Sequence, residues 1–263
     1  MEVKTDLTII IPTLNNINGL AYLLNYFKNK QYEVVVIDNK KKNLGFAGGV
    51  NKGAEGVKTK WMLILNDDIE FPTDPIETLI QFAEKEKLDA VSPILRNPNG
   101  EVENYGYYLL SIGKIELIKE IPRSKSQDPN KSKILNTKYE ILDTDIDGIT
   151  AACLLVKTEV FKKLGGFDEK FFAYLEDVDF FLRMKKLKDD SGQARMTFGI
   201  AYDVEVLHNH MTTTKTMGNF KARQDMVNWW RLYFKHPEKF KFNLDFIIER
   251  LRNISGFVKA SLK

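Results

Sequence analysis

Cysteine is nearly absent from this chain of 263 residues, since Cys153 is its only one. A single cysteine excludes an intramolecular disulfide and fits a reducing compartment, and its place in an apolar run favours a buried structural thiol. Long apolar runs are also missing, and no segment approaches the length needed to span a bilayer. The polar start of the chain lacks the pattern of a signal peptide, so the sequence predicts a cytoplasmic protein.

Charge of one sign is not in excess either. The 39 Lys and Arg residues against 36 Asp and Glu give a net charge of +3, too small and too evenly spread to indicate a nucleic-acid partner. Two nucleotide fingerprints are missing, because residues 45–49 have neither the GxGxxG spacing nor the ending of a P-loop. The hydrophobic fraction of 43% is ordinary for one large α/β domain, with or without a small appendage.

Apolar, β-branched runs alternate with amphipathic segments through the first hundred residues. Strands are expected at 7–11, 33–38, 61–65 and 88–94, and helices at 18–30, after Gly45 and at 74–87. This alternation predicts a doubly wound α/β sheet, mostly parallel, that binds ligands at the carboxyl ends of its strands. Asp38, Asn39, Asp67 and Asp68 all fall at such ends.

The second half of the chain continues this mixed pattern. More strand is expected at 100–120, 149–156, 196–200 and 203–208, with helices at 158–164 and 176–187. Residues 122–138 are polar and predict a mobile loop. The last forty-odd residues are helical in pattern.

Two acidic signals, more than a hundred residues apart, carry most of the functional information. Asp67 and Asp68 follow a buried strand, and such a carboxylate pair can hold a divalent cation that keeps substrate phosphates as further ligands. Glu176 and Asp177 form a second pair that can supply a general base. The structural alternatives are a helix cap for the first pair and first-turn acids that complement a helix dipole for the second.

Two weaker signals accompany these carboxylates. The glycines of residues 45–49 let the backbone approach a ligand at a helix start that favours anions, although glycine clusters more often serve helix packing. His208 ends an apolar segment, where a histidine is either structural or completes a metal site. Metal, phosphate and base together suggest group transfer from a diphosphate donor.

Taken in this order, these residues resemble the family 2 glycosyltransferases, nucleotide-sugar enzymes of the GT-A fold. The likeness is greatest to the rhamnosyl- and galactofuranosyltransferase-like branch and spans residues 7 to about 210. It is carried by segments 11–15, 36–39, 43–49, 65–68, 147–156, 165–168, 174–179 and 206–208. Each motif is common alone, and their joint occurrence is specific.

The resemblance implies a donor site for a dTDP- or UDP-linked sugar. The residues that would hold the nucleotide and sugar are Pro12, Thr13, Asn15, Asp38, Asn39, Gly45, Phe46, Ala47, Asn51, Asn66 and Asp67. The resemblance also implies a Mg²⁺ or Mn²⁺ ion across the diphosphate. Its ligands would be Asp68, Asp67 and His208.

On the acceptor side, the resemblance implies that Asp177 is the general base and that Glu176 positions the acceptor. Asp147, Gly148 and Thr150 would line the sugar and acceptor side. The reaction would be an inverting, in-line displacement at the anomeric carbon. The acceptor would be a glycan or a lipid-linked sugar in cell-surface polysaccharide synthesis.

One departure from the family keeps a second function open. Only Asn39 and three lysines separate Asp38 from Asn43, where relatives usually carry a longer loop. This shortening changes one wall of the nucleoside pocket and favours the alternative of a non-catalytic nucleotide-sugar-binding or scaffold protein of the same fold. A nucleotidyltransferase is a further alternative, but it needs a Gly-rich, basic signature after the first strand, which residues 12–16 do not supply.

The end of the chain is expected to form a helical extension, residues 216–263, packed on a catalytic domain of residues 1–215. Five apolar residues there recur at helical spacing: Leu244, Ile247, Leu251, Ile254 and Val258. The stripe favours packing on the catalytic domain or on a second copy in a homodimer. The alternative is peripheral contact with a membrane, at its inner face, which suits a lipid-linked acceptor.

Overall fold

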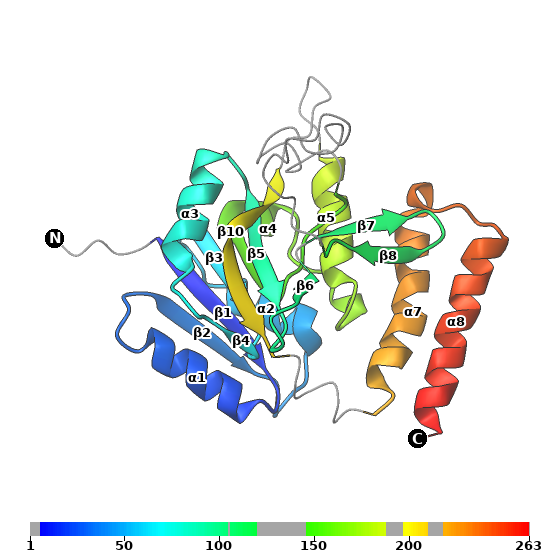
Figure 1. The fold of residues 1–263 in the computed structure, drawn as a ribbon, viewed down its shortest axis with the longest axis horizontal. Helices are drawn as coiled ribbons and strands as arrows, with labels where there is room; N and C mark the ends of the chain where they lie inside the picture. Colours follow the sequence, from blue (N-terminus) through cyan, green and yellow to red (C-terminus); the bar gives the residue numbers. More distant parts are fainter. Residues whose placement is uncertain (1–5, 105, 120–145, 188–196, 210–217, 263) are drawn as a thin grey trace.

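The computed structural model describes residues 6–104, 106–119, 146–187, 197–209 and 218–262. A twisted central sheet carries helices on both faces, and a pair of long C-terminal helices stands at one side of the molecule (Figure 1). The loop predicted at 122–138 and the polar start of the chain at 1–5 lie outside the described residues. So does most of the junction predicted near residue 215, and the division into two domains stays a prediction.

The central sheet has the strand order β2-β1-β3-β9-β5-β10-β4, with β6 paired to β5. Its strands are β1 (Leu7–Thr13), β2 (Glu33–Asp38), β3 (Trp61–Leu65), β4 (Ile69–Glu70), β5 (Ala90–Arg96), β6 (Val102–Asn104), β9 (Cys153–Lys157) and β10 (Phe198–His208). β1 pairs in parallel with β2 and β3, and β5 with β10, whereas β9 runs antiparallel between β3 and β5. The predicted α/β sheet, mostly parallel, is confirmed.

Alternate residues of the strands face two separate cores, which is the physical basis of the doubly wound arrangement. Ile9 and Ile11 of β1 pack in one core and Ile10 in the other, and all three are fully buried. The helices that flank the sheet are α1 (Ile17–Phe27), α2 (Gly45–Ala54), α3 (Ile76–Lys85), α4 (Thr158–Lys163) and α5 (Glu176–Lys186). Their positions agree with the predicted helices.

Two strand predictions are wrong in detail. The strand expected at 149–156 begins only at Cys153, because Ile149 to Ala152 are buried in a turn rather than paired in the sheet. The two strands expected at 196–200 and 203–208 form one strand, β10, whose register with β5 shifts between Ala201 and Glu205. The polar residues in the middle of β10 coincide with this irregularity, which explains the apparent break in the sequence.

A third core joins the C-terminal helices to the rest of the molecule. The elements involved are the hairpin of β7 (Tyr107–Leu110) and β8 (Lys114–Leu117), the helices α7 (Phe220–Lys235) and α8 (Leu244–Ser261), and the short 3-10 helices η1 (Glu169–Phe171) and η2 (Pro237–Lys239). Trp229 and Leu232 of α7 and Phe246 of α8 pack with Leu175 and Val178 near the start of α5. The acid pair at that start therefore lies beside the C-terminal helices.

The apolar stripe of α8 does not pack on the rest of the described chain, so the expected packing on the catalytic domain is not seen, and packing on a second copy stays a prediction. Phe246 and Arg250 are the buried residues of α8, and the apolar contacts are made by that face. The stripe residues Leu244 and Leu251 are 70% and 57% exposed, and Ile247, Ile254 and Val258 are exposed as well. Helical spacing identifies an apolar face but does not say what covers it. None of the described helices is both long and apolar enough to cross a membrane.

Candidate functional site

The carboxyl ends of β1, β2 and β3 and the end of β10 bring several predicted residues to one edge of the sheet. Thr13 lies opposite Asp38 at the ends of β1 and β2. Asp67 and Asp68 follow β3, and the pairing of His208 with Ile69 places β10 beside them. The backbone N–H of Asn209 donates to the Asp68 carbonyl at 2.9 Å.

Asp67 is held by two neighbours that the strand–loop connections supply. The Thr13 hydroxyl donates to Oδ2 of Asp67 at 2.6 Å, and Nδ2 of Asn16 donates to the Asp67 carbonyl at 2.8 Å. Burial raises the pKa of Asp67. Asn16, which also caps α1 by accepting from the Gly19 N–H, was not among the predicted residues. Its position directly before an amphipathic helix is the signal that identifies it.

Asp68, His208 and Glu103 form a line of side chains. Nε2 of His208 lies 3.2 Å from Oδ1 of Asp68, and Nδ1 lies 3.1 Å from Oε2 of Glu103. Burial lowers the pKa of His208, but the two carboxylates outweigh this effect and raise the pKa to about 9. A carboxylate on the far nitrogen is how metal-binding histidines are usually oriented. Glu103 was not predicted, because nothing in the local sequence links β6 to β10.

These side chains fit a metal that completes its shell with phosphate oxygens. Apart from its contact with His208, the buried Oδ1 of Asp68 has no hydrogen-bond partner among the described residues. Asp67, the third predicted ligand, is already engaged by Thr13. No group of three His, Cys, Asp or Glu side chains in the described ranges could hold a metal alone. One or two protein ligands with substrate phosphates is the usual arrangement for Mg²⁺.

The short loop after β2 folds around Asn39. The side chain of Asn39 is buried, where Nδ2 donates to the Gly45 carbonyl at 3.2 Å and Oδ1 accepts from the Leu44 N–H at 3.3 Å. Its N–H donates to the Thr13 carbonyl at 2.8 Å. Asp38 stays exposed. The loop therefore uses Asn39 to close itself, and the exposed Asp38 carboxylate, whose Oδ1 accepts from the Lys40 N–H at 2.9 Å, is the acidic side chain at this end of the strands.

The start of α2 is closed by a turn near the acid pair. Gly45 has φ +72°, and a Cβ there would lie 2.3 Å from the carbonyl oxygen of Phe172. The Ala47 N–H donates to that same carbonyl at 3.1 Å. Phe46 packs on Phe167, with ring centroids 6.0 Å apart. The start of α2, where the glycines lie, is thus hydrogen-bonded through its backbone to the turn at 171–175.

Asn51 lies apart from the other predicted donor residues. Its side chain donates to the Phe167 carbonyl at 2.8 Å and accepts from the Phe167 N–H at 2.9 Å. It lines a cavity of about 380 Å³ with Asp168, Arg183 and Lys235. Six residues along α2 from Gly45 correspond to roughly 9 Å. The structure thus places Asn51 against residues 166–169 rather than at the strand ends, where Pro12 is buried and Asn15 exposed.

Glu176 and Asp177 begin α5, as predicted, after an unusual turn. Phe172, Tyr174 and Leu175 all have positive φ (62°, 68° and 67°), a conformation that costs on the order of 1 kcal/mol or more for each such residue. Burial raises the pKa of both carboxyl groups, and the Asp177 charge raises that of Glu176 further. Oε2 of Glu176 is buried without a hydrogen-bond partner in the described part of the chain. Strain and unpaired acids together are typical of functional sites.

The turn at 149–152 connects the two acidic signals. The Asn66 N–H, just before Asp67, donates to the Ala152 carbonyl at 2.9 Å. The Ala151 N–H donates to Oδ2 of Asp177 at 3.4 Å. The carboxylate pairs, separated by more than a hundred residues, therefore lie on either side of one short segment.

The other predicted acceptor residues build the wall next to Asp177. Oδ2 of Asp147 accepts from the Leu109 N–H at 2.8 Å, and the Thr150 hydroxyl accepts from the Ala152 N–H at 3.2 Å. Gly148 bridges to Tyr107, whose hydroxyl is buried; a Cβ on Gly148 would lie 2.1 Å from it. Burial and the nearby carboxylates raise the pKa of Tyr107. The sequence marks Tyr107 only as one of several tyrosines.

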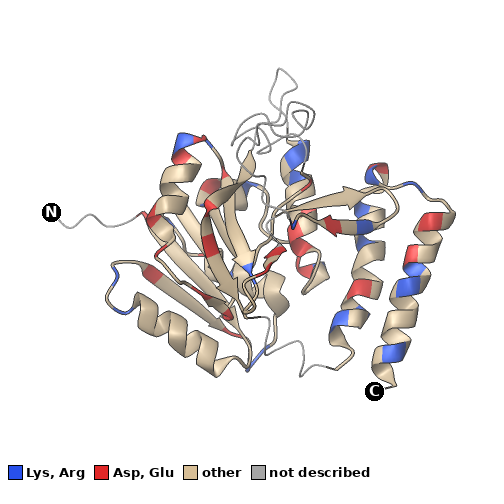
Figure 2. Cartoon of the chain, viewed as in Figure 1, with Lys and Arg blue, Asp and Glu red and all other residues tan. Residues whose placement is uncertain are grey.

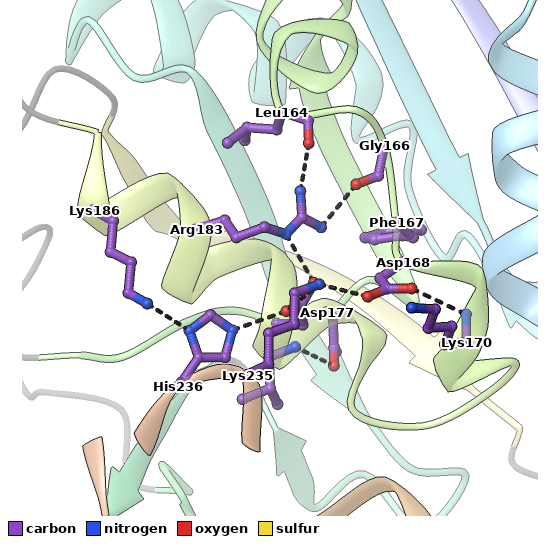
Figure 3. Close-up of polar contacts among 12 residues, drawn as sticks. Leu164, Gly166, Phe167, Asp168, Lys170, Asp177, Arg183, Lys186, Lys235 and His236 are labelled. Atoms are coloured by element: carbon purple, nitrogen blue, oxygen red, sulfur yellow. Dashed lines mark hydrogen bonds and ion pairs between the residues drawn. The ribbon is translucent and has the colours of Figure 1, made fainter. Parts of the chain in front are cut away.

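The helix α5 also carries a charge network around a buried carboxylate (Figure 3). Asp179 is fully buried and accepts from Nε of Arg183 and Nε2 of His236, each at 2.8 Å. The Lys235 ammonium lies 2.9 Å from the same carboxylate. Although burial raises it, these cationic and hydrogen-bonding partners lower the pKa of Asp179 to about 2. The network fixes α5 to the end of α7.

Comparison with known proteins shows which proteins the chain is similar to. The family model described as Glycosyl transferase family 2 matches residues 39–165. An N-acetylglucosaminyl-diphospho-decaprenol L-rhamnosyltransferase of Mycobacterium tuberculosis is 25% identical over 72% of this chain and 67% of its own. The rhamnosyltransferase WbbL of Escherichia coli is 26% identical over 59% of this chain and 67% of its own. A crystal structure of S. aureus TarS, residues 1–349, has 12% identity and a TM-score of 0.49, covering 97% of this chain and 80% of that one.

Proposed function

We propose that the chain, a glycosyltransferase with a match to glycosyl transferase family 2, is metal-dependent and inverts the anomeric carbon of its donor sugar. The domain implies sugar transfer from a nucleotide-sugar donor in polysaccharide synthesis. The acceptor would be a hydroxyl of a glycan or a lipid-linked sugar. A dTDP- or UDP-linked hexose is the proposed donor.

The meeting of the two acidic pairs at residues 151–152 is the observation that best supports this reaction. A transferase needs a site for the departing diphosphate and a base for the incoming hydroxyl within one substrate's length. The scaffold alternative needs only the first of these. Because Glu176 is kept buried with an unpaired oxygen and the turn before it is strained, at some cost in stability, a catalytic role explains the acid pair and a scaffold does not.

On the donor side, Asp68 and His208 would hold Mg²⁺ or Mn²⁺, with Glu103 fixing the imidazole ring. The metal, when bound, neutralises the charge that grows on the leaving diphosphate. Asp67, held by hydrogen bonds from Thr13 and Asn16, would contact the ribose or support the metal. Asp38 is the exposed side chain at the nucleoside end of the site.

On the acceptor side, Asp177 would accept the proton of the attacking hydroxyl. Its carboxylate accepts from the N–H groups of Val178 and Ala151 at 2.8 and 3.4 Å, and the residue is partly exposed, so a substrate can reach it. The raised pKa makes it a stronger base than an exposed aspartate. Glu176, whose Oε2 is unpaired, would accept a hydrogen bond from a second hydroxyl of the acceptor and so position the acceptor. A single displacement from the opposite side of the sugar inverts the configuration.

A thermal-shift screen tests the donor site without a known acceptor. UDP, dTDP, GDP and CMP would each be added with and without Mn²⁺, because a ligand that binds the folded state raises its melting temperature. We expect one nucleoside diphosphate to give a metal-dependent shift that Asp68→Ala removes. Asp225→Asn, on the exposed side of α7, is the control and should keep the shift. No shift with any nucleotide would favour the scaffold alternative.

We also propose that α8 rests on a membrane surface that carries the acceptor. The apolar side chains Leu244, Ile247, Leu251, Ile254 and Val258 form one uncovered face, and Leu262 at its end is 83% exposed. The basic residues of α8 lie toward its end and the acidic ones toward its start (Figure 2). The M. tuberculosis relative is named for a decaprenol-linked acceptor, which is a membrane lipid. A helix of this kind binds by burying its apolar face among lipid headgroups.

Flotation with vesicles of phosphatidylglycerol and phosphatidylcholine tests this contact. We expect the protein to float with anionic vesicles and the double variant Leu244→Gln, Leu251→Gln to remain at the bottom. The variant should keep its metal-dependent nucleotide shift, since α8 lies outside the donor site. If the protein does not float and instead forms a dimer that the double variant dissociates, the partner of this face is a second copy of the chain and not a membrane.

A further inference from the structure

The turn that precedes the acid pair is held from both sides through its carbonyl groups. Residues 171–174 end η1 and lead into α5, and three of the four non-glycine residues with positive φ in the described chain lie in 172–175. A turn in this conformation has no helix or sheet partner for its carbonyls. Within the turn, the Phe171 carbonyl accepts from the Ala173 N–H at 2.7 Å, and the other carbonyls depend on hydrogen bonds from other elements.

Asn228 of α7 supplies most of these bonds. Its Nδ2 lies 2.9, 2.8 and 2.7 Å from the carbonyl oxygens of Phe171, Ala173 and Tyr174. The residue is fully buried, so water cannot take its place. Nη1 of Arg231 donates to Oδ1 of Asn228 at 2.7 Å, which fixes the amide with its NH₂ group toward the turn.

The remaining carbonyl of the turn is bound from the donor side. The Ala47 N–H, in the first turn of α2, donates to the Phe172 carbonyl at 3.1 Å. All four carbonyls of residues 171–174 are thus held: that of Phe172 by α2, and the other three by the two amide hydrogens of Asn228, with the Phe171 carbonyl also bound within the turn. The next two residues along the chain after Leu175 are Glu176 and Asp177. Any shift of the turn moves the acid pair relative to the diphosphate end of the site.

We propose that Asn228 is a positioning residue for Glu176 and Asp177. Its role is to keep the strained turn in the one conformation that aims the two carboxylates at the acceptor. This role rests on the proposed function of the acid pair. A purely structural role is the alternative, and it predicts that loss of Asn228 weakens every activity of the protein equally.

The test compares Asn228→Asp with Asn219→Asp. The first variant keeps the shape of the side chain and replaces the donor NH₂ group by an oxygen that repels the three carbonyls. The second makes the same change at the start of the same helix, where the side chain is exposed and contacts Ser261. We expect Asn228→Asp to lower the transfer kcat about 100-fold, the usual effect of a displacement of about 1 Å. Binding of the nucleoside diphosphate with Mn²⁺ should change less than twofold, and Asn219→Asp should match the wild type.

A double variant separates positioning from folding. If Asn228 acts through Asp177, then Asn228→Asp should cause less than a twofold further loss when Asp177 is already Asn, because neither variant has a base to misplace. A further loss close to 100-fold would overturn the proposal, as would an equal loss of nucleotide binding. If Asp177→Asn alone transfers at the wild-type rate, the proposed base is wrong and the proposed function fails separately.

A surface variant covers the case in which Asn228→Asp does not fold. Arg231→Met removes the bond that orients the Asn228 amide, and Arg231 itself is exposed, so the fold should be kept. We expect a smaller loss of kcat, about tenfold, with nucleotide binding unchanged. Arg231→Lys, which can still donate to Oδ1 of Asn228, should recover most of the activity. Full activity in Arg231→Met would count against the proposal.

Discussion

Asp179 provides the sharpest test of the packing between α5 and α7. In the folded protein its pKa is lowered from 3.8 to about 2, although burial alone would raise it, because His236, Arg183 and Lys235 surround the carboxylate. A folded-state pKa below the unfolded one stabilises the protein above the unfolded pKa, and this stabilisation is lost as the pH falls through the folded value. The difference corresponds to about 2 kcal/mol at pH 5 and about 1 kcal/mol at pH 3.

Urea unfolding of the wild type and Asp179→Asn at pH 5 and pH 3 measures this difference. At pH 5 the variant should be less stable by about 3 kcal/mol or more, because it also leaves the partly buried Arg183 and Lys235 without a counter-charge. At pH 3 the gap should be about 1 kcal/mol smaller. Asp225→Asn, which breaks an exposed pair with Lys221, should cost less than about 0.5 kcal/mol at both values. A gap that is the same at pH 5 and pH 3 would refute the reasoning.

Three further predictions concern the site itself. Gly45→Ala should destabilise the protein by at least about 1 kcal/mol and slow transfer, because Gly45 has a positive φ and the new Cβ would clash with Phe172. In the control Gly56→Ala the new Cβ meets no atom within 4 Å, so stability and transfer should not change. In the pH profile of kcat/KM, activity should rise with pH as Asp177 loses its proton. Because burial raises the pKa of Asp177, this rise should lie above the usual aspartate range near pH 4. A rise at or below about pH 4 would argue against Asp177 as the base. Glu176→Gln should slow transfer yet keep or raise the melting temperature at neutral pH. The raised pKa of Glu176 means that its ionised carboxylate opposes folding at that pH. A lower melting temperature with unchanged transfer would contradict this prediction.

Local patterns in the sequence were sufficient for the strands, the helices and the acid pairs. The runs that end at Asp38 and before Asp67 form parallel strands, and α5 begins at Glu176 as predicted. These features depend on side-chain periodicity and on the positions of polar residues next to apolar runs, which a single segment displays. The family 2 glycosyltransferase resemblance is confirmed by the match over residues 39–165.

Long-range pairing could not be predicted in the same way. Nothing in the sequence places β9 between β3 and β5, and this insertion is what brings Ala151 and Ala152 between the two acidic pairs. Glu103 and Asn228 were missed for the same reason, because each acts on residues far away in the chain. The exposed stripe of α8 shows the limit of periodicity, which identified the helix correctly but could not say what covers its apolar face.

The transfer rate of Asp177→Asn, with a defined donor and acceptor, tests the central claim most directly. The variant keeps the size of the side chain and the hydrogen bond from the Val178 N–H but cannot accept a proton. We expect turnover to fall by ~10²–10⁴ while binding of the donor nucleotide is unchanged. A rate close to that of the wild type would contradict the assignment of the base and, with it, the proposed mechanism.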